Sequence, residues 1–282
     1  MRYKLVAMDV DGTLTDSTGK IPKENVNAIR MLCEKGVTFV ISTGRNDIEI
    51  ARLAHEIGIE PLIIGCNGAT VRNLNTQKTF VYEHIESEPL KQLFAIAQED
   101  KLSMRLASTD YMYLAFPEHD IFKHSQQTRR ASTYERTMLT ENAVNVIDDF
   151  EHLAELEDKI IKAVIINEAE RVFAFREKAI KIPGLAGFRS SPRCLDIVNE
   201  NVSKGTALNM LAAQLGIKQS EVIAIGDGEN DIPMLEFAGM AIVMENAEDS
   251  VKDAANFITK SHNDAGLAYA LHEVFNTNLN SV

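Results

Sequence analysis

Short apolar runs alternate with segments of helical periodicity in the first part of the chain. Tyr3–Met8, Val37–Ser42 and Pro61–Gly65 are predicted strands, and Asn25–Lys35 and Asp47–Ile57 are predicted helices between them. A glycine follows each helix, as is common at helix C-termini. Strands that are apolar almost throughout and are separated by helices are typical of a parallel sheet covered on both faces.

The same alternation returns near the C-terminus. Ser203–Leu215 is a predicted helix in which Ser203 stands at the N-cap. Glu221–Asp227 is a predicted strand, a helix begins at Asp231, and Met240–Met244 is a further strand. This part of the chain therefore continues the α/β pattern of the first part, and both are expected to build one sheet.

The middle of the chain has fewer glycines and fewer continuous apolar runs. The expected elements are a helix over Glu88–Lys101, a hairpin turning near Thr109 and Asp110, a polar helical stretch, a strand over Ile160–Ile166, a helix over Glu168–Ile180, and two strands flanking Pro192. The predicted fold class is α/β. A Rossmann-like parallel-sheet core of residues 1–83 and 190–282 holds an inserted α+β cap domain of residues 84–189.

Composition narrows the range of partners. Hydrophobic residues make up 45% and charged residues 25% of the chain, which allows a sizeable core. The net charge of −12 argues against nucleic acid as the main partner. The three cysteines form no paired motif, and neither a signal peptide nor a membrane-spanning run is visible. A soluble cytoplasmic protein, monomeric or homodimeric and without a membrane partner, is expected.

Four polar motifs stand at the ends of predicted strands or at a helix start. They are "DVDGT" (Asp9–Thr13), "STGR" (Ser42–Arg45), "SKG" (Ser203–Gly205) and "GDGEND" (Gly226–Asp231). Each motif by itself also fits an ordinary turn, a helix cap or a surface lysine. Ligands of an open parallel sheet bind beyond the carboxyl ends of its strands. Four such motifs at these positions therefore indicate one binding or catalytic site.

Several other phosphate-binding and hydrolytic motifs are absent from the sequence. It contains neither the P-loop pattern G-x-x-x-x-G-K-[ST] nor a complete dinucleotide-binding G-x-G-x-x-G. The nucleophile elbow G-x-S-x-G is missing as well. The seven histidines form no i, i+4 pair that would indicate a metal site. These absences argue against a P-loop protein, a dinucleotide-binding enzyme and a serine hydrolase of the nucleophile-elbow type.

The four motifs together resemble those of the haloacid dehalogenase-like hydrolase superfamily. The inserted middle segment and "NGA" (Asn67–Ala69) are similar to its Cof-type branch, whose cap is of type IIB. The resemblance implies a Mg²⁺-dependent phosphatase that hydrolyses small phosphate monoesters, such as sugar phosphates, through an aspartyl phosphate. It also implies that the cap supplies substrate specificity. The chain departs from the branch in "NENVSKG", which lacks the proline and glycine common just before the lysine, so the local turn there is in question.

The resemblance assigns the reacting and metal-binding groups. Asp9 matches the nucleophile and Asp11 the general acid/base. The Mg²⁺ ligands would be the carboxylates of Asp9 and Asp227 and the backbone carbonyl of Asp11, with Asp231 as a further candidate. Oxygen-only ligands suit a hard divalent cation.

The resemblance also assigns the phosphate-binding and substrate-contacting groups. The phosphoryl group would meet the backbone N–H groups of Val10 and Gly44 and the side chains of Thr43, Lys204 and Asn230. Arg45 and Arg189 are weaker candidates for contacts to the leaving group.

The roles of Asp9 and Asp11 require different environments. Asp9 must be ionised to attack phosphorus, whereas Asp11 must carry a proton when the ester oxygen leaves. If the extended backbone continues past Asp9, their spacing places both side chains on one side of the strand. Two other functions fit the motifs: a phosphotransferase or phosphomutase that passes the phosphoryl group to a sugar, and a non-catalytic phosphometabolite sensor. The sensor is disfavoured because it would be expected to lose Asp9 or Asp11, and this chain keeps both.

Overall fold

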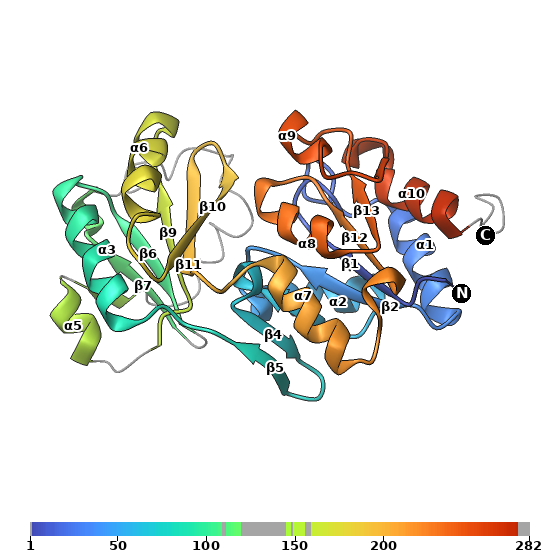
Figure 1. The fold of residues 1–282 in the computed structure, drawn as a ribbon, viewed down its shortest axis with the longest axis horizontal. Coiled ribbons are helices and arrows are strands. Elements are labelled where there is room, and N and C mark those ends of the chain that lie inside the picture. The colour runs from blue at the N-terminus through green and yellow to red at the C-terminus, as the bar shows by residue number, and fades with distance from the viewer. Residues whose placement is uncertain (1, 109–110, 120–144, 148, 156–158, 276–282) are drawn as a thin grey trace. The chain divides into compact units, whose positions relative to one another are not determined.

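The chain folds into an α/β unit and a second, α+β unit inserted in it (Figure 1). The computed structural model describes residues 2–108, 111–119, 145–147, 149–155 and 159–275. The first unit comprises Met1–Tyr82 and Ser203–Val282, and the second comprises Glu83–Val202. No helix among the described residues is long and apolar enough to cross a membrane.

The first unit is built on a sheet whose strands follow the order β14-β13-β12-β1-β2-β3-β4-β5. Its strands are β1 (Leu5–Met8), β2 (Thr38–Ser42), β3 (Leu62–Gly65), β4 (Thr70–Asn73), β5 (Lys78–Tyr82), β12 (Val222–Gly226), β13 (Met240–Val243) and β14 (Phe257–Ile258). All pairings from β14 to β3 are parallel. Because β1 lies between β2 and β12, the loops that follow these three strands emerge along the same edge of the sheet.

Helices cover both faces of this sheet. They are α1 (Lys23–Glu34), α2 (Asp47–Ile57), α7 (Lys204–Gln214), α8 (Ile232–Phe237), α9 (Asp249–Lys252) and α10 (Gly266–Phe275), with 3₁₀ turns η1 (Cys66–Gly68), η3 (Gln219–Glu221), η4 (Glu229–Asp231) and η5 (His262–Asp264). Figure 1 shows α1 packed beside α10, and α7 beside α8. Alternate residues of β1 enter different clusters: Val6 packs with α1 and α10, and Ala7 packs with α7 and α8. This explains why β1 is apolar at every position.

An antiparallel hairpin extends the sheet beyond its parallel part. β4 pairs antiparallel with β3, and β5 pairs antiparallel with β4. The alternation of apolar and helical segments does not predict this hairpin. Its turn is built locally, since the side chain of Asn73 accepts from the N–H groups of Asn75 and Thr76 and Gln77 adopts a positive φ.

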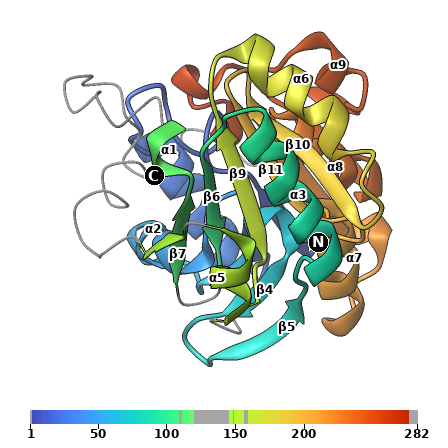
Figure 2. The same ribbon diagram turned by 90° about the vertical axis from the view of Figure 1, so that its left-hand side faces the viewer.

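The second unit is a sheet with helices packed on one face. Its strands are β6 (Met104–Ala107), β7 (Met112–Ala115), β8 (Asn145–Ile147), β9 (Lys162–Ile166), β10 (Leu185–Ser191) and β11 (Cys194–Asn199), in the order β10-β11-β9-β6-β7-β8. Its helices are α3 (Ser87–Glu99), α5 (Phe150–Glu155) and α6 (Ala169–Ala179), with the 3₁₀ turn η2 (Pro117–His119). Figure 2 shows α3 beside α6 over this sheet, where Leu93, Phe94 and Phe175 are buried in the core of the unit.

The observed elements match most of the predicted ones, and the largest difference concerns the boundary between the two units. The boundary expected at residues 189 and 190 lies inside β10, because both strands that flank Pro192 belong to the sheet of the second unit. The first unit resumes at Ser203 instead. The turn expected at Thr109 and Asp110 and most of the polar helical stretch lie outside the described residues.

Candidate active site

The two aspartates of "DVDGT" lie in different environments just after β1. The Asp9 N–H donates to the carbonyl of Ile225 at 2.9 Å, so the parallel pairing of the strand continues to this residue. The chain then turns, since the N–H groups of Leu14 and Thr15 donate back to the carbonyl of Val10 at 3.0 Å. As a result, Asp9 is 7% exposed, whereas the side chain of Asp11 is 57% exposed. The extended geometry that would have placed both side chains together ends at Asp9.

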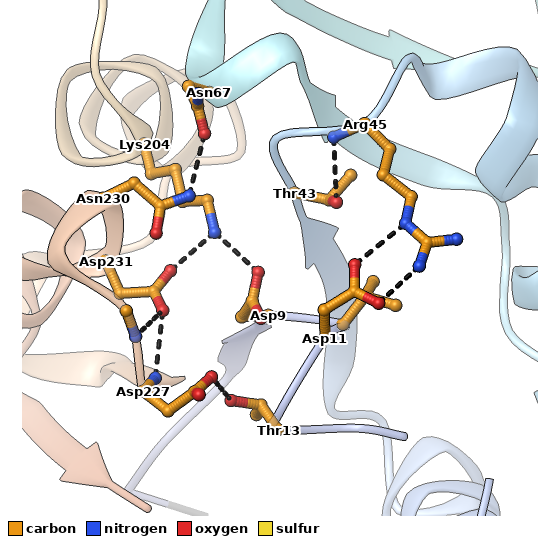
Figure 3. A network of polar contacts seen from close by, with 12 residues as sticks. Asp9, Asp11, Thr13, Thr43, Arg45, Asn67, Lys204, Asp227, Asn230 and Asp231 are labelled. Atoms are coloured by element: carbon orange, nitrogen blue, oxygen red, sulfur yellow. Dashed lines mark hydrogen bonds and ion pairs between the residues drawn. The ribbon is translucent and has the colours of Figure 1, made fainter. Parts of the chain in front are cut away.

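Lys204 forms the centre of the buried part of the site. It is the first residue of α7, whose N-terminus is held by a capping box between Ser203 and Thr206. The Lys204 side chain is completely buried, and its Nζ lies 2.6 Å from Asp9 Oδ1 and 2.6 Å from Asp231 Oδ1 (Figure 3). The turn that departs from the Cof pattern is thus a regular helix start that carries the lysine inward.

The charges of this cluster shift the ionisation of its members. Burial by itself lowers the pKa of Lys204, but the carboxylates of Asp231 and Asp9 overcome this effect and hold it above its usual range. Burial raises the pKa of Asp9 well above its usual range; Lys204 opposes this rise, and the carboxylates of Asp231 and Asp227 add to it. Lys204 is therefore the permanent cation of the site, and full ionisation of the carboxylates around it calls for further positive charge.

The loop after β12 supplies the second group of carboxylates. Asp231 is fully buried, and its Oδ2 accepts from the backbone N–H groups of Asp227 at 3.0 Å and Gly228 at 2.9 Å. Because Asp231 also accepts from Lys204, it fixes both the loop and the lysine. Asp227 accepts from Thr13 Oγ1 at 2.9 Å and from Asn246 Nδ2 at 3.2 Å. Burial, followed by the charge of Asp231, raises the pKa of Asp227 to about 6.

Three carboxylates converge in a way that fits a divalent cation. Oxygens of Asp9, Asp227 and Asp231 lie within 4.8 Å of one another. When all are ionised, three carboxylates against the single ammonium of Lys204 leave two negative charges uncompensated. Oxygen-only donors with this charge match a hard cation such as Mg²⁺. Asp231 already accepts three hydrogen bonds, so Asp9 and Asp227 are the better direct ligands.

The motif that follows β2 lies next to Asp9 and Asp11. Thr43 is buried, its N–H donates to the carbonyl of Ile64, and its Oγ1 accepts from the Arg45 N–H at 3.1 Å. Gly44 is the residue between them. Arg45 forms a two-pronged ion pair with Asp11, in which Nε lies 2.8 Å from Oδ2 and a terminal nitrogen contacts Oδ1 (Figure 3). The sequence suggested Arg45 as a substrate contact and did not indicate this pair.

The remaining predicted residues divide between the two units. Asn230 is in η4 of the first unit, where its Nδ2 donates to Asn67 Oδ1 at 2.9 Å. Arg189 is in β10 of the second unit. The structure thus brings Asp9, Lys204, Asp227, Asn230 and Asp231 into one cluster of the first unit, with Thr43 and the Asp11–Arg45 pair beside it (Figure 3).

Three polar residues of the site were not identified as functional from the sequence. Thr13 and Asn246 both hydrogen-bond to Asp227, and Asn246 also donates to the carbonyl of Gly12 at 3.0 Å. Asn67 contacts Asn230. Thr13 and Asn67 stood inside quoted motifs, "DVDGT" and "NGA", but no spacing rule connects them with their partners. Asn246 stood outside every motif.

Comparisons with known proteins identify the family of this chain. The sequence pattern of the haloacid dehalogenase-like hydrolase family matches residues 6–271. YxeH of Bacillus subtilis (strain 168) is 31% identical over 280 residues, which cover 96% of this chain and 98% of that protein. The 5-amino-6-(5-phospho-D-ribitylamino)uracil phosphatase YwtE of the same organism is 27% identical over 282 residues, covering 96% and 98% of the two chains.

A solved structure extends the similarity to the fold. The subclass IIB sugar phosphatase BT4131 superposes with a TM-score of 0.82 over 98% of this chain and 100% of that chain, at 22% identity. Because the family pattern spans nearly the whole chain and the two units have the fold of such a phosphatase, fold and sequence lead to one assignment. The chain belongs to the haloacid dehalogenase-like hydrolase family and is a phosphatase of that family.

Proposed function

We propose that this protein is a Mg²⁺-dependent phosphatase of small phosphate monoesters that works through an aspartyl phosphate on Asp9. The observation that carries the proposal is the position of Asp9: it is buried at the end of β1, bound to Lys204 Nζ at 2.6 Å, and within 4.8 Å of two further carboxylates. Such a cluster combines a carboxylate nucleophile with the positive charge that a phosphoryl group requires.

Asp9 and Asp227 would hold the cation, with the Asp11 carbonyl as a further ligand and Asp231 as a support. When bound, Mg²⁺ would neutralise negative charge on the phosphoryl oxygens and on Asp9. Lys204 and the Asn230 amide are the chain's own donors to those oxygens, together with the Thr43 hydroxyl and the N–H groups of Val10 and Gly44.

The reaction would then proceed in two steps. A carboxylate oxygen of Asp9 forms a bond to phosphorus while the bond to the ester oxygen breaks, and Asp11 gives its proton to the departing oxygen. A water molecule next attacks phosphorus, Asp11 takes the proton from that water, and the bond between Asp9 and phosphorus breaks to release phosphate. The Asp11 carboxylate takes no part in the cluster formed by Asp9, Asp227 and Asp231, where the cation would neutralise Asp9, and this separation supports the division of roles.

The ion pair between Asp11 and Arg45 gives Arg45 a role in this cycle. The guanidinium holds both oxygens of the Asp11 carboxylate, so it fixes the orientation of the acid/base. Arg45 would release Asp11 when an anionic substrate offers other acceptors. In that state Arg45 would contact the substrate, and Arg189 in the second unit is a further candidate contact, supplied by the cap.

The choice of substrates to test follows from the relatives. Sugar phosphates, FMN, pyridoxal phosphate and 5-amino-6-(5-phospho-D-ribitylamino)uracil, the substrate in the name of YwtE, form a suitable panel. The net charge of −12 disfavours nucleic acid as substrate. A cytoplasmic location and a monomeric or homodimeric state remain predictions of the sequence.

The proposal is tested by measuring phosphate release from this panel with Mg²⁺ and with a chelator. We expect Mg²⁺-dependent release that Asp9→Asn reduces at least about a thousandfold, because the nucleophile is lost while the shape of the site is kept. Asp11→Asn should slow turnover roughly 10²- to 10⁴-fold. Mass spectrometry of the acid-quenched enzyme should detect the phosphorylated Asp9 peptide.

Three results would contradict parts of the proposal. Turnover by Asp9→Asn at the wild-type rate would exclude Asp9 as nucleophile. Formation of an isomeric sugar phosphate in place of free phosphate would identify a phosphomutase. Saturable binding of esters with Mg²⁺ present, but without turnover of any of them, would identify a sensor.

A further inference from the structure

The loop after β3 has an unusual backbone. Three consecutive residues have positive φ: Cys66 at 48°, Asn67 at 58° and Gly68 at 106°. Two of them carry a side chain, and left-handed backbone is costly for such residues although asparagine tolerates it better than most. Strained backbone of this kind persists only where the surrounding structure holds it, and it is concentrated at functional sites. This loop contains the "NGA" motif, to which the proposed function gives no role.

The backbone of the loop is anchored to two elements of the candidate site. The Asn67 N–H donates to the carbonyl of Thr43 at 3.0 Å, and the Cys66 N–H donates to the carbonyl of Arg45 at 2.8 Å. Gly68 approaches the start of α7 so closely that a Cβ there would lie 2.3 Å from the carbonyl oxygen of Ser203. The loop therefore bridges the residues after β2 and the N-terminus that carries Lys204.

The side chain of Asn67 makes a third connection. It is completely buried, and its Oδ1 accepts from Asn230 Nδ2 at 2.9 Å (Figure 3). An amide nitrogen carries two hydrogens, so one can bind Asn67 while the other remains for an acceptor in the site. If the Asn230 side-chain amide were flipped, its oxygen would take the place of its nitrogen and would repel an anion bound there. Asn67 is therefore placed to select the orientation that favours phosphate.

We propose that Asn67 is a positioning residue, which acts through Asn230 by fixing the Asn230 amide with its nitrogen toward the phosphoryl group. The inference rests on the proposed function, since it assumes that Asn230 contacts phosphate. Asparagine meets both requirements of the position, because it tolerates the left-handed backbone and offers an uncharged acceptor. Glycine would meet only the first requirement, and aspartate would add a buried charge.

The variant that separates the two requirements is Asn67→Gly. Glycine relieves the backbone cost at φ 58°, so the free energy of unfolding is expected to be retained better than with alanine. Gln77→Gly is the matched control, because Gln77 has φ 57° in the exposed turn between β4 and β5. We expect Asn67→Gly to weaken the binding of inorganic phosphate, measured by calorimetry with Mg²⁺ present, at least about tenfold, as for a lost hydrogen bond to a charged group. Gln77→Gly should leave phosphate binding unchanged.

A double-mutant cycle tests whether Asn67 acts through Asn230. The measured quantity is the effect of Asn230→Ala on phosphate Kd and on kcat/KM in three backgrounds. It should be large in the wild type, small in Asn67→Gly, and large again in Asn67→Asp, which keeps an acceptor for the Asn230 amide. A purely structural role for Asn67 would leave the effect of Asn230→Ala equal in all backgrounds. If Asn67→Gly does not fold, Asn67→Ala takes its place, since alanine also lacks the acceptor and the effect of Asn230→Ala should again be small.

The outcomes separate this inference from the proposed function. The role of Asn67 would be overturned, with ester hydrolysis intact, by either of two results. One is that Asn67→Gly and Asn230→Ala change the phosphate Kd independently, so that their fold-changes multiply in the double variant. The other is a wild-type phosphate Kd in Asn67→Gly. Phosphate binding with the expected pattern but no ester hydrolysis would overturn the function and keep the inference. Absence of both phosphate binding and hydrolysis in the wild type would overturn both.

Discussion

Replacing Lys204 with methionine should destabilise the metal-free protein severely. The substitution keeps most of the side-chain volume and removes the ammonium that lies 2.6 Å from Asp9 Oδ1 and 2.6 Å from Asp231 Oδ1. The Lys204 side chain is completely buried and the Asp231 side chain is 1% exposed, so water cannot replace the lost partner. The carboxylate of Asp227 shares the cluster and adds to the repulsion.

The size of the effect follows from this burial. Removing one partner of a buried ion pair costs about 3–5 kcal/mol, because the remaining charge stays desolvated and unpaired. For a domain of this size, each kcal/mol lowers Tm by roughly 2–4 °C, so a loss of roughly 6–20 °C is expected. A surface pair of the same length behaves differently. Lys4 and Glu221 are also 2.6 Å apart, but the Lys4 side chain is 54% exposed and water screens the pair.

The assay is differential scanning calorimetry at pH 7.5 in a chelator, with Lys4→Met as the matched control. We expect a large fall in Tm for Lys204→Met and a Tm near that of the wild type for Lys4→Met. Added Mg²⁺ should recover part of the loss, since a divalent cation can replace the missing positive charge among the carboxylates. Equal Tm values for the two variants in chelator would refute the idea that Lys204 balances a buried cluster of carboxylates.

Two further predictions concern the metal site. The pKa of Asp227 is raised to about 6, so below this pH the metal-free folded protein keeps a proton that the unfolded chain loses. The Tm of the protein in chelator should therefore fall as the pH rises through 6. Because protonated Asp227 cannot bind a cation, the affinity for Mg²⁺ should fall below pH 6. Thermal unfolding in chelator and Mg²⁺ titrations at several pH values measure the two effects, and the pH dependence of both should shrink in Asp227→Asn. Gly12→Ala should abolish Mg²⁺ binding and turnover, because its Cβ would lie 2.2 Å from Asp227 Oδ2. Gly19→Ala, also at positive φ but in open space, should bind Mg²⁺ normally; if both variants bind alike, the proposed clash is wrong.

The apolar and polar pattern alone was sufficient for β1, β2, β3, β12 and β13 of the parallel part of the sheet, whereas the two-residue strand β14 was not predicted. Strands such as β1 are buried on both faces, so every residue must be apolar, and this requirement is visible in one dimension. The antiparallel hairpin β4–β5 was not predicted, because its edge strand β5 is largely exposed and carries polar residues. The predicted boundary at residues 189 and 190 falls inside β10, because β10 and β11 form a hairpin that joins the sheet through the pairing of β11 with β9, far back in the chain.

The candidate site shows the same division between local and long-range information. The places of Asp9 and Asp227 at the ends of predicted strands followed from the pattern, and their chemistry followed from the resemblance of the four motifs to the family. Lys204 would ordinarily be assigned to the surface, and only the fold buries it between Asp9 and Asp231. The pairing of Arg45 with Asp11 joins loops after two different strands and has no signal in either motif.

The sequence by itself determined most of the helices and buried strands, the polar motifs that follow the strands, and the residue types available for phosphoryl transfer, because these depend on local periodicity and side-chain chemistry. The tertiary structure decided which groups meet, how deeply each is buried, and therefore how each ionises. It separated Asp9 from Asp11 by turning the chain at Val10. It also connected Asn67 with Asn230 across the sheet edge. Distances between residues far apart in the chain, and the loss of water around them, arise only when the strands assemble.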